Sequence, residues 1–126
     1  LEGLADRHAP VAPLAEGWAM SDDGVLDLLP LLGTLADIDD AAYGAALFHA
    51  TLVAALTEWV RVAARRSGVN TVALGGGCFM NRILATRLRM QLERLGLTVL
   101  EARQAPPNDG GLALGQAAVA RALGRA

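Results

Sequence analysis

One stretch of the chain, between Thr71 and Leu100, limits most strongly what the sequence can fold into. A short β-forming run, Thr71–Leu74, leads into three successive glycines, and Asn81–Leu95 then places leucines at helical spacing. Gly96 is predicted to end that helix, and Leu97–Leu100 is a second β-forming run. Because a strand–helix–strand crossover makes its two strands parallel, the sequence predicts an α/β fold with a partly parallel sheet flanked by helices.

The loops that follow two parallel strands open toward the same edge of the sheet. Here these loops are residues 75–80 and residues 102–109, and a last helix, Leu112–Leu123, is predicted after the second loop. Ligands of open α/β sheets bind outside the carboxyl ends of the strands. If the two strands are neighbours, we therefore expect both loops to face one crevice.

The first part of the chain has weaker patterns. Leu1–Trp18 contains prolines and no clean period, so we expect it to be irregular. Trp18–Leu26 is expected to form two short strands around an Asp-Asp-Gly turn. Asp27–Leu35 is predicted to be a short helix that is interrupted near Pro30.

A long helix is predicted to follow, capped by Asp39 or Asp40 and ended by Gly68. Its apolar part, Ala41–Val60, is long enough to cross a membrane, but it contains His49 and Glu58, and charged groups are costly inside a bilayer. The pattern favours a buried helix of a soluble protein over a membrane span. One helical side carries Ala45, His49, Leu52, Leu56, Trp59 and Ala63.

Composition excludes several classes of function. The formal net charge is -2, so no global positive field favours nucleic acid or an anionic membrane. Every basic residue is arginine, which excludes Walker-A phosphate binding and lysine Schiff-base chemistry. The hydrophobic content of 53% is high for 126 residues, which indicates a face covered by an oligomer, by a partner or by further sequence.

Gly75, Gly76 and Gly77 form the first candidate binding element. Successive glycines allow a ligand to approach the backbone closely, and the start of the next helix favours an anion such as phosphate. Glycine also occurs in strand-to-helix turns for geometry alone, so both interpretations stay open. The spacing is not a dinucleotide-binding fingerprint, because Met80 occupies the position of the third glycine.

Other candidates allow both a structural and a functional interpretation. Asn81 could cap its helix or hydrogen-bond a nucleotide base or ribose, and Asp109 could cap the last helix or bind a metal. Cys78 could be a nucleophile at a helix start, although a lone cysteine is more often a small buried residue. His8 and His49 are not at metal-ligand spacing and are expected to be satisfied or partly buried.

Three motifs resemble the hydrogenase-maturation carbamoyltransferases, the HypF family. They are the Phe48-His49 pair, the segment Val72–Arg82 and the segment Pro106–Gln116. The resemblance implies that residues 1–126 are the C-terminal portion of a Kae1-like carbamoyltransferase domain in a larger multidomain protein. It also implies an actin-like, sugar-kinase-like ATPase fold, of which this chain is one lobe, and a cytoplasmic location.

The resemblance implies the chemistry as well. In such proteins carbamoyl phosphate and ATP give carbamoyl adenylate, and the carbamoyl group passes to the C-terminal cysteine of the partner HypE. Carried over by motif, Gly75, Gly76, Gly77 and Asn81 resemble the nucleotide-contacting residues, and Asp109 resembles the aspartate that binds a divalent metal (Zn, Fe or Mg). No catalytic residue, nucleic acid or membrane is implied.

The chain departs from the family pattern in ways that matter for activity. The His-x-x-x-His metal pair is absent, Gly75 replaces a more usual serine, and Cys78 stands where an apolar residue is usual. We therefore expect this piece alone to be inactive, with the missing ligands and domains supplied by further sequence. A transferase that modifies tRNA or an antibiotic, or a non-catalytic interaction lobe, is the alternative.

Overall fold

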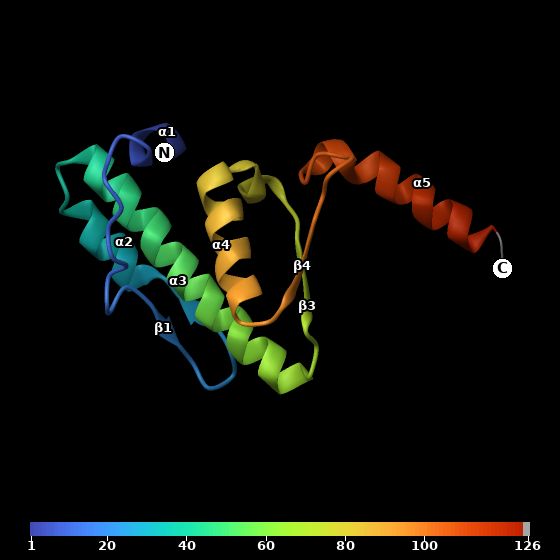
Figure 1. The fold of residues 1–126 in the computed structure, drawn as a ribbon, viewed down its shortest axis with the longest axis horizontal. Coiled ribbons are helices and arrows are strands. Elements are labelled where there is room, and N and C mark those ends of the chain that lie inside the picture. Colours follow the sequence, from blue (N-terminus) through green and yellow to red (C-terminus); the bar gives the residue numbers. More distant parts are fainter. Residues whose placement is uncertain (125–126) are drawn as a thin grey trace.

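The structure, a computed structural model that describes residues 1–124, is built around one long helix (Figure 1). Its elements, with η marking 3-10 helices, are α1 (Glu2–Ala5), β1 (Ala19–Met20), β2 (Leu26–Asp27), α2 (Leu29–Ala36), α3 (Ala41–Ser67), β3 (Thr71–Leu74), η1 (Gly77–Met80), α4 (Arg82–Arg94), β4 (Thr98–Glu101), η2 (Asp109–Gly111) and α5 (Leu112–Leu123).

The predicted strand–helix–strand unit is confirmed. β3 and β4 pair in parallel, with Thr71 opposite Thr98 and Leu74 opposite Glu101. α4 connects them and packs against the sheet, so that helices flank a short parallel sheet as expected. The observed helix is slightly shorter than predicted: it ends at Arg94, and Leu95 lies at its C-terminal cap. Leu95 is 45% exposed and is therefore not part of the buried leucine stripe.

The main core lies between α4, α3 and one face of the β3–β4 pair. Leu74, Leu88 and Leu92 are buried at its centre, and Leu92 has no exposed surface. Burial of one leucine contributes about 1.5–3 kcal/mol, so the leucine stripe of α4 is what fixes this helix on the sheet. The partly buried residues around this centre are Leu56, Val60, Val72, Phe79, Leu97 and Val99.

The caps predicted for the long helix are confirmed. The Asp40 carboxylate accepts hydrogen bonds from the N–H groups of Ala42 and Tyr43, at 2.9 and 3.0 Å. Gly68 ends α3 in the left-handed conformation, with φ of 71°. Both ends therefore use the residue types whose chemistry satisfies the free backbone groups of a helix.

The predicted buried side of α3 is only partly correct. Trp59 is 41% exposed, although its indole N–H donates to the Gly24 carbonyl at 2.8 Å. Burial extends to residues outside the stripe, including Thr51 and Val53, because α1, α2 and α4 all pack against this helix. By length and composition α3 is the one helix of the described residues that could cross a membrane, and 39% of its most apolar window is buried inside the protein.

Two expectations for the first part of the chain were wrong. Residues 1–18 are not wholly irregular, because α1 buries Ala5 against Ala45 of α3. α2 is not interrupted at Pro30, because this proline lies in the first turn, where its missing N–H has no intrahelical partner to lose. The hairpin around the Asp-Asp-Gly turn is confirmed, with β1 and β2 antiparallel.

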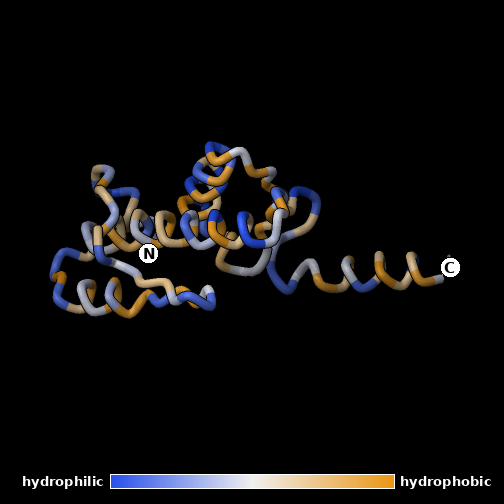
Figure 2. Tube along the Cα trace, turned by 90° about the horizontal axis from the view of Figure 1, so that it is seen from below, coloured by the Kyte–Doolittle hydropathy of each residue, from blue (hydrophilic) through white to orange (hydrophobic). Residues whose placement is uncertain are grey.

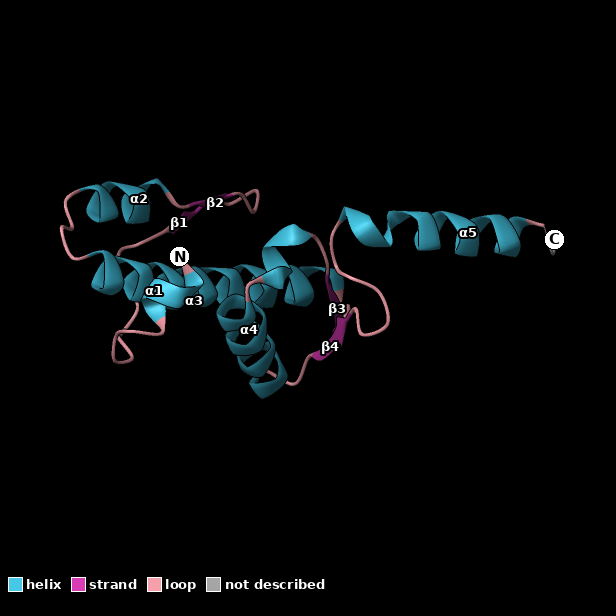
Figure 3. Ribbon diagram, turned by 90° about the horizontal axis from the view of Figure 1, so that it is seen from above, coloured by secondary structure: helices cyan, strands magenta, loops and turns pink. Residues whose placement is uncertain are grey.

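The last helix, α5, projects away from the rest of the molecule (Figures 1 and 3). None of its residues is buried. Figure 2 shows hydrophobic positions recurring along it, and the exposed fractions reach 60% for Val119 and 72% for Leu123. The sheet lies between α4 and α5 in Figure 1, so α5 makes no part of the main core.

Candidate functional site

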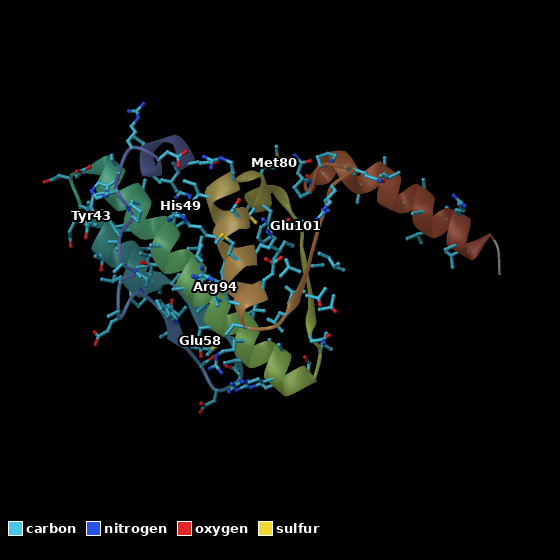
Figure 4. The ribbon with its side chains drawn as sticks, in the orientation of Figure 1. Tyr43, His49, Glu58, Met80, Arg94 and Glu101 are labelled. Atoms are coloured by element: carbon cyan, nitrogen blue, oxygen red, sulfur yellow. The ribbon has the colours of Figure 1, made fainter. Side chains whose placement is uncertain are left out.

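The two loops that were predicted to share a crevice lie together at the carboxyl ends of β3 and β4. The Gly76 N–H donates to the Pro107 carbonyl at 2.6 Å, which joins the two loops directly. The Asn108 side-chain amide lies 3.0 Å from the Met80 sulfur, and Figure 4 shows Met80 at the turn beyond β3, beside the start of α5. The parallel pairing therefore brings both motifs to one place, as expected from strand polarity.

The glycine turn exposes its backbone. Gly75, Gly76 and Gly77 are all exposed, and a Cβ on Gly75 or Gly76 would meet no atom within 4 Å. Gly76 has φ of 102°, a conformation that side chains strongly disfavour. Gly76 is thus required for the turn, whereas the open space above Gly75 permits the close approach of a ligand.

Close packing explains the second glycine pair of the site. A Cβ on Gly111 would lie 2.7 Å from the Pro106 carbonyl oxygen, and one on Gly110 would lie 3.1 Å from the Pro106 ring. The Pro-Pro segment is therefore folded tightly onto η2. This folding places Asp109 at the start of η2, and Asp109 lines the same open cavity as Gly75 and Gly76.

An open cavity of about 940 Å³ lies beside these loops and along α5. It is at the upper end of the size range of small-molecule sites, and apolar atoms dominate its surface. The polar side chains in its lining are Asn108 and Asp109 in the loop and Gln116 on α5. Its lining includes Gly75, Gly76, Pro107, Asp109, Leu112 and Val119.

The Asn81 side chain makes two hydrogen bonds: one caps α4, and the other joins it to α3. Its Oδ1 accepts a hydrogen bond from the Leu84 N–H at 3.0 Å, which confirms the capping interpretation. Its Nδ2 lies 2.8 Å from Nε2 of His49, a wholly buried residue of α3. Figure 4 shows His49 on the side of α3 that is turned toward the N-terminal end of α4. The burial of His49 was expected from the sequence, but its contact with Asn81, 32 positions away, was not.

Asp109 is not the cap of the last helix. The N-cap position of α5 is Gly111, and no side chain caps this helix. The short η2 turn just before it is capped by Asn108, whose Oδ1 accepts from the Gly110 N–H at 3.0 Å. Asp109 is exposed, and its carboxylate makes no hydrogen bond or ion pair within residues 1–124. A free, exposed carboxylate fits one ligand position of a divalent cation. In that same range no group of three His, Cys, Asp or Glu residues could hold a metal, so Asp109 would need ligands from elsewhere.

The expectation that Cys78 is buried was wrong. Cys78 lies in η1 with its thiol exposed, because the 3-10 turn directs only Phe79 partly toward the core. His8 and His49 are both hydrogen-bonded, as predicted, His8 through Nδ1 to the Ala9 carbonyl at 2.8 Å. Backbone groups and one carboxylate can bind an anion or a cation, but this arrangement offers no paired acid and base for proton transfer.

One ion-pair cluster near the site was not predicted. Arg82, the first residue of α4, lies 2.7 Å from the Asp6 carboxylate and 3.4 Å from that of Glu2. These ion pairs link α1 and its C-terminal cap to the first turn of α4, next to Asn81. Asp6 and Arg82 are 76 positions apart in the sequence, and no local pattern indicates that they pair.

A protein-family model described as "Carbamoyltransferase, Kae1-like Domain, second subdomain" matches residues 1–116 of this chain. Carbamoyltransferase HypF2 of Cupriavidus necator is 56% identical over 107 residues, which are 85% of this chain and 13% of that protein. Carbamoyltransferase HypF of Rhizobium leguminosarum bv. viciae is 47% identical over 110 residues, which are 86% of this chain and 14% of that protein.

A solved structure shares the fold. The crystal structure of full-length HypF in the phosphate- and nucleotide-bound form superposes with a TM-score of 0.78 at 29% sequence identity. The superposition covers 95% of this chain and 17% of that one. The chain therefore spans less than a fifth of the length of these relatives.

Proposed function

This chain belongs to the HypF carbamoyltransferase family, as the second subdomain of its Kae1-like domain, and from that premise we propose that it forms one side of a nucleotide- and metal-binding site. The observation that carries the proposal is the joining of the two strand-end loops by the Gly76–Pro107 hydrogen bond. This bond holds an exposed glycine turn and a carboxylate that has no partner within residues 1–124 next to one open cavity.

The nucleotide would be bound at the glycine turn. Gly75 and Gly76 leave their backbone uncovered, and ATP or carbamoyl adenylate carries anionic phosphate groups that exposed backbone N–H groups can bind. Asn81 adds an amide at the end of the turn, because Nδ2 has a second hydrogen after its contact with His49. A HypF structure has been solved with nucleotide and phosphate bound, which supports the assignment by similarity.

Asp109 would supply one ligand to a divalent cation. The residue fits this role because Asn108 performs the capping and leaves the carboxylate free. A cation held there would stabilise the negative charge of the nucleotide phosphates. The remaining ligands would come from the rest of the longer protein, since Asp109 has no acidic, histidine or cysteine cluster around it within residues 1–124.

The reaction that this site would serve is carbamoyl transfer. Carbamoyl phosphate and ATP would form carbamoyl adenylate, and the carbamoyl group would pass to the C-terminal cysteine of HypE. The role of this chain in that reaction would be to bind and orient the nucleotide, because we assign it no catalytic residue. The high identity to proteins named HypF favours this reaction over the modification of tRNA or of an antibiotic.

Nucleotide binding by the full-length protein tests the proposal. We expect Gly76→Val to weaken ATP binding by about tenfold or more, because a branched side chain blocks approach to the backbone and resists positive φ. Gly68→Val is the matched control. Gly68 also has positive φ and open space around its Cβ position, but it lies at the opposite end of β3.

Titration calorimetry on both variants separates ligand contact from backbone strain. Equal melting temperatures with a loss of ATP affinity only in Gly76→Val would support the proposal. Unchanged ATP affinity in a folded Gly76→Val protein would refute it.

A further inference from the structure

We infer that His49 is a positioning residue, which holds the Asn81 amide in the one orientation that serves the nucleotide site. The inference rests on the proposed nucleotide site and deepens it. Its basis is the hydrogen-bond pair at His49: Nδ1 lies 2.7 Å from the Ala45 carbonyl oxygen, and Nε2 lies 2.8 Å from Nδ2 of Asn81.

These contacts determine which atoms donate. A carbonyl oxygen only accepts, so Nδ1 of His49 carries the hydrogen and donates to Ala45. In a neutral imidazole Nε2 then has a lone pair, and it accepts a hydrogen bond from the Asn81 NH₂ group. The tautomer of His49 therefore follows from its own helix, in which residue 45 is one turn before residue 49.

The same contacts prevent the Asn81 amide from rotating by half a turn. In the observed orientation Oδ1 accepts from the Leu84 N–H and Nδ2 donates to His49. A rotated amide would place NH₂ against the Leu84 N–H and oxygen against the Nε2 lone pair, so both hydrogen bonds would be lost. Two independent partners thus fix the Asn81 side chain before a ligand arrives. Binding of the ligand then loses less side-chain entropy, because the amide is already ordered.

The placement of the pair connects the core to the site. His49 has no exposed surface and lies on α3, whose neighbours hold it from several sides, whereas Asn81 is half-buried at the end of the glycine turn. Asn81 retains one amide hydrogen and one oxygen lone pair for a ligand. His49 would therefore act on the nucleotide through Asn81, without touching it.

Three variants of the full-length protein test the inference. His49→Leu keeps volume and removes the acceptor, so we expect a loss of ATP affinity of about tenfold and a rise in KM for ATP with a smaller change in kcat. His49→Gln carries an oxygen near the position of Nε2, so we expect it to restore most of that affinity. If His49→Leu does not fold, His49→Asn replaces it, because asparagine is polar but too short to reach Asn81.

Thr51→Val is the matched control. Thr51 is equally buried on α3, and its hydroxyl accepts a hydrogen bond from the Leu14 N–H at 3.0 Å, away from the glycine turn. We expect Thr51→Val to lower the melting temperature and leave ATP affinity within about twofold of wild type. A general loss of packing would instead lower affinity equally in His49→Leu and in Thr51→Val, and this result would overturn the inference.

Comparison with the glycine variants separates the two proposals. Wild-type ATP affinity in His49→Leu, together with a loss in Gly76→Val, would refute the positioning role and keep the nucleotide site. Unchanged affinity in both variants would refute both. A loss in His49→Leu that His49→Gln restores, with Thr51→Val unaffected, would support the positioning role.

Discussion

At the level of single residues, Asp109 gives the sharpest test of the metal site. Because Asn108 caps η2, Asp109→Asn removes a charge without removing a cap. We expect this variant of the full-length protein to keep its melting temperature but to lose bound metal and carbamoyl transfer together, since an amide binds a cation more weakly than a carboxylate does. Metal content and turnover, measured on one preparation, check the prediction.

The control is the neighbouring residue. Asn108→Ala should lower stability by about 1 kcal/mol through the lost cap, with its metal content retained. Wild-type metal content in Asp109→Asn would show that this aspartate is not a ligand.

The residue roles that could be predicted from the sequence are those with local chemistry. The cap at Asn81 was predictable because a helix start needs a side-chain acceptor within three residues, and Leu84 provides the N–H. The contact of Asn81 with His49 was not predictable, because it joins two helices across the core. Asp109 and Asn108 stand side by side, so residue preference alone could not decide which one caps.

At the level of elements, the cap of α3 should make stability depend on pH. The N–H groups of Tyr43 and Ala42 hold the pKa of the Asp40 carboxyl below its ordinary value. A lowered pKa means that the ionised cap stabilises the fold above the ordinary value, and that this stabilisation is lost as the pH falls through the lowered pKa. We expect the melting temperature to fall in acid partly for this reason.

Asp40→Asn is the variant that isolates this effect. Asparagine caps helices about as well as aspartate does but does not ionise. The two proteins should therefore have similar melting temperatures near neutral pH, and the melting temperature of the wild type should fall further than that of Asp40→Asn as the pH decreases. Parallel curves over the whole range would contradict the prediction.

The elements with regular patterns could be predicted, and the exceptions have physical causes. The β3–α4–β4 unit follows from the leucine period and the glycines at both ends of the helix. α1 was missed because a helix of only 4 residues has no measurable period and is held by tertiary contacts to α3 and to Arg82. The effect of Pro30 was misjudged because its position within the helix could not be read from the sequence.

At the level of the whole molecule, the apolar side of α5 is expected to be covered in the full-length protein. Val119 and Leu123 lie one turn apart on one side and are largely exposed here. In the full-length protein the double variant Val119→Ala, Leu123→Ala should lower stability by about 2 kcal/mol or more, because buried methyl groups are removed. In the 126-residue chain the same variant should change the melting temperature little.

Arg121 provides the control for this comparison. It lies on the opposite side of the helix from Val119, so Arg121→Ala should leave both proteins about equally stable. A similar, small effect of the double variant in both proteins would show that α5 stays uncovered.

The 126-residue chain is also expected to lack carbamoyl transfer by itself. One free carboxylate and an open glycine turn form only one side of a site, and a working metal centre needs several ligands held in place. An assay of the purified chain with ATP, carbamoyl phosphate and metal should show no turnover above the rate without protein. Metal-dependent turnover by the chain alone would contradict the arrangement proposed here.

The projection of α5 has a consequence for hydrogen exchange. A helix of 12 residues, none of which is buried, is only marginally stable in water, so its backbone hydrogen bonds break often and its amide hydrogens exchange with the solvent. In the 126-residue chain, deuterium should therefore enter α5 rapidly, while the amides of α4, around Leu88 and Leu92, stay protected by the core. In the full-length protein, slow exchange in α5 would show that other parts of the protein cover this helix.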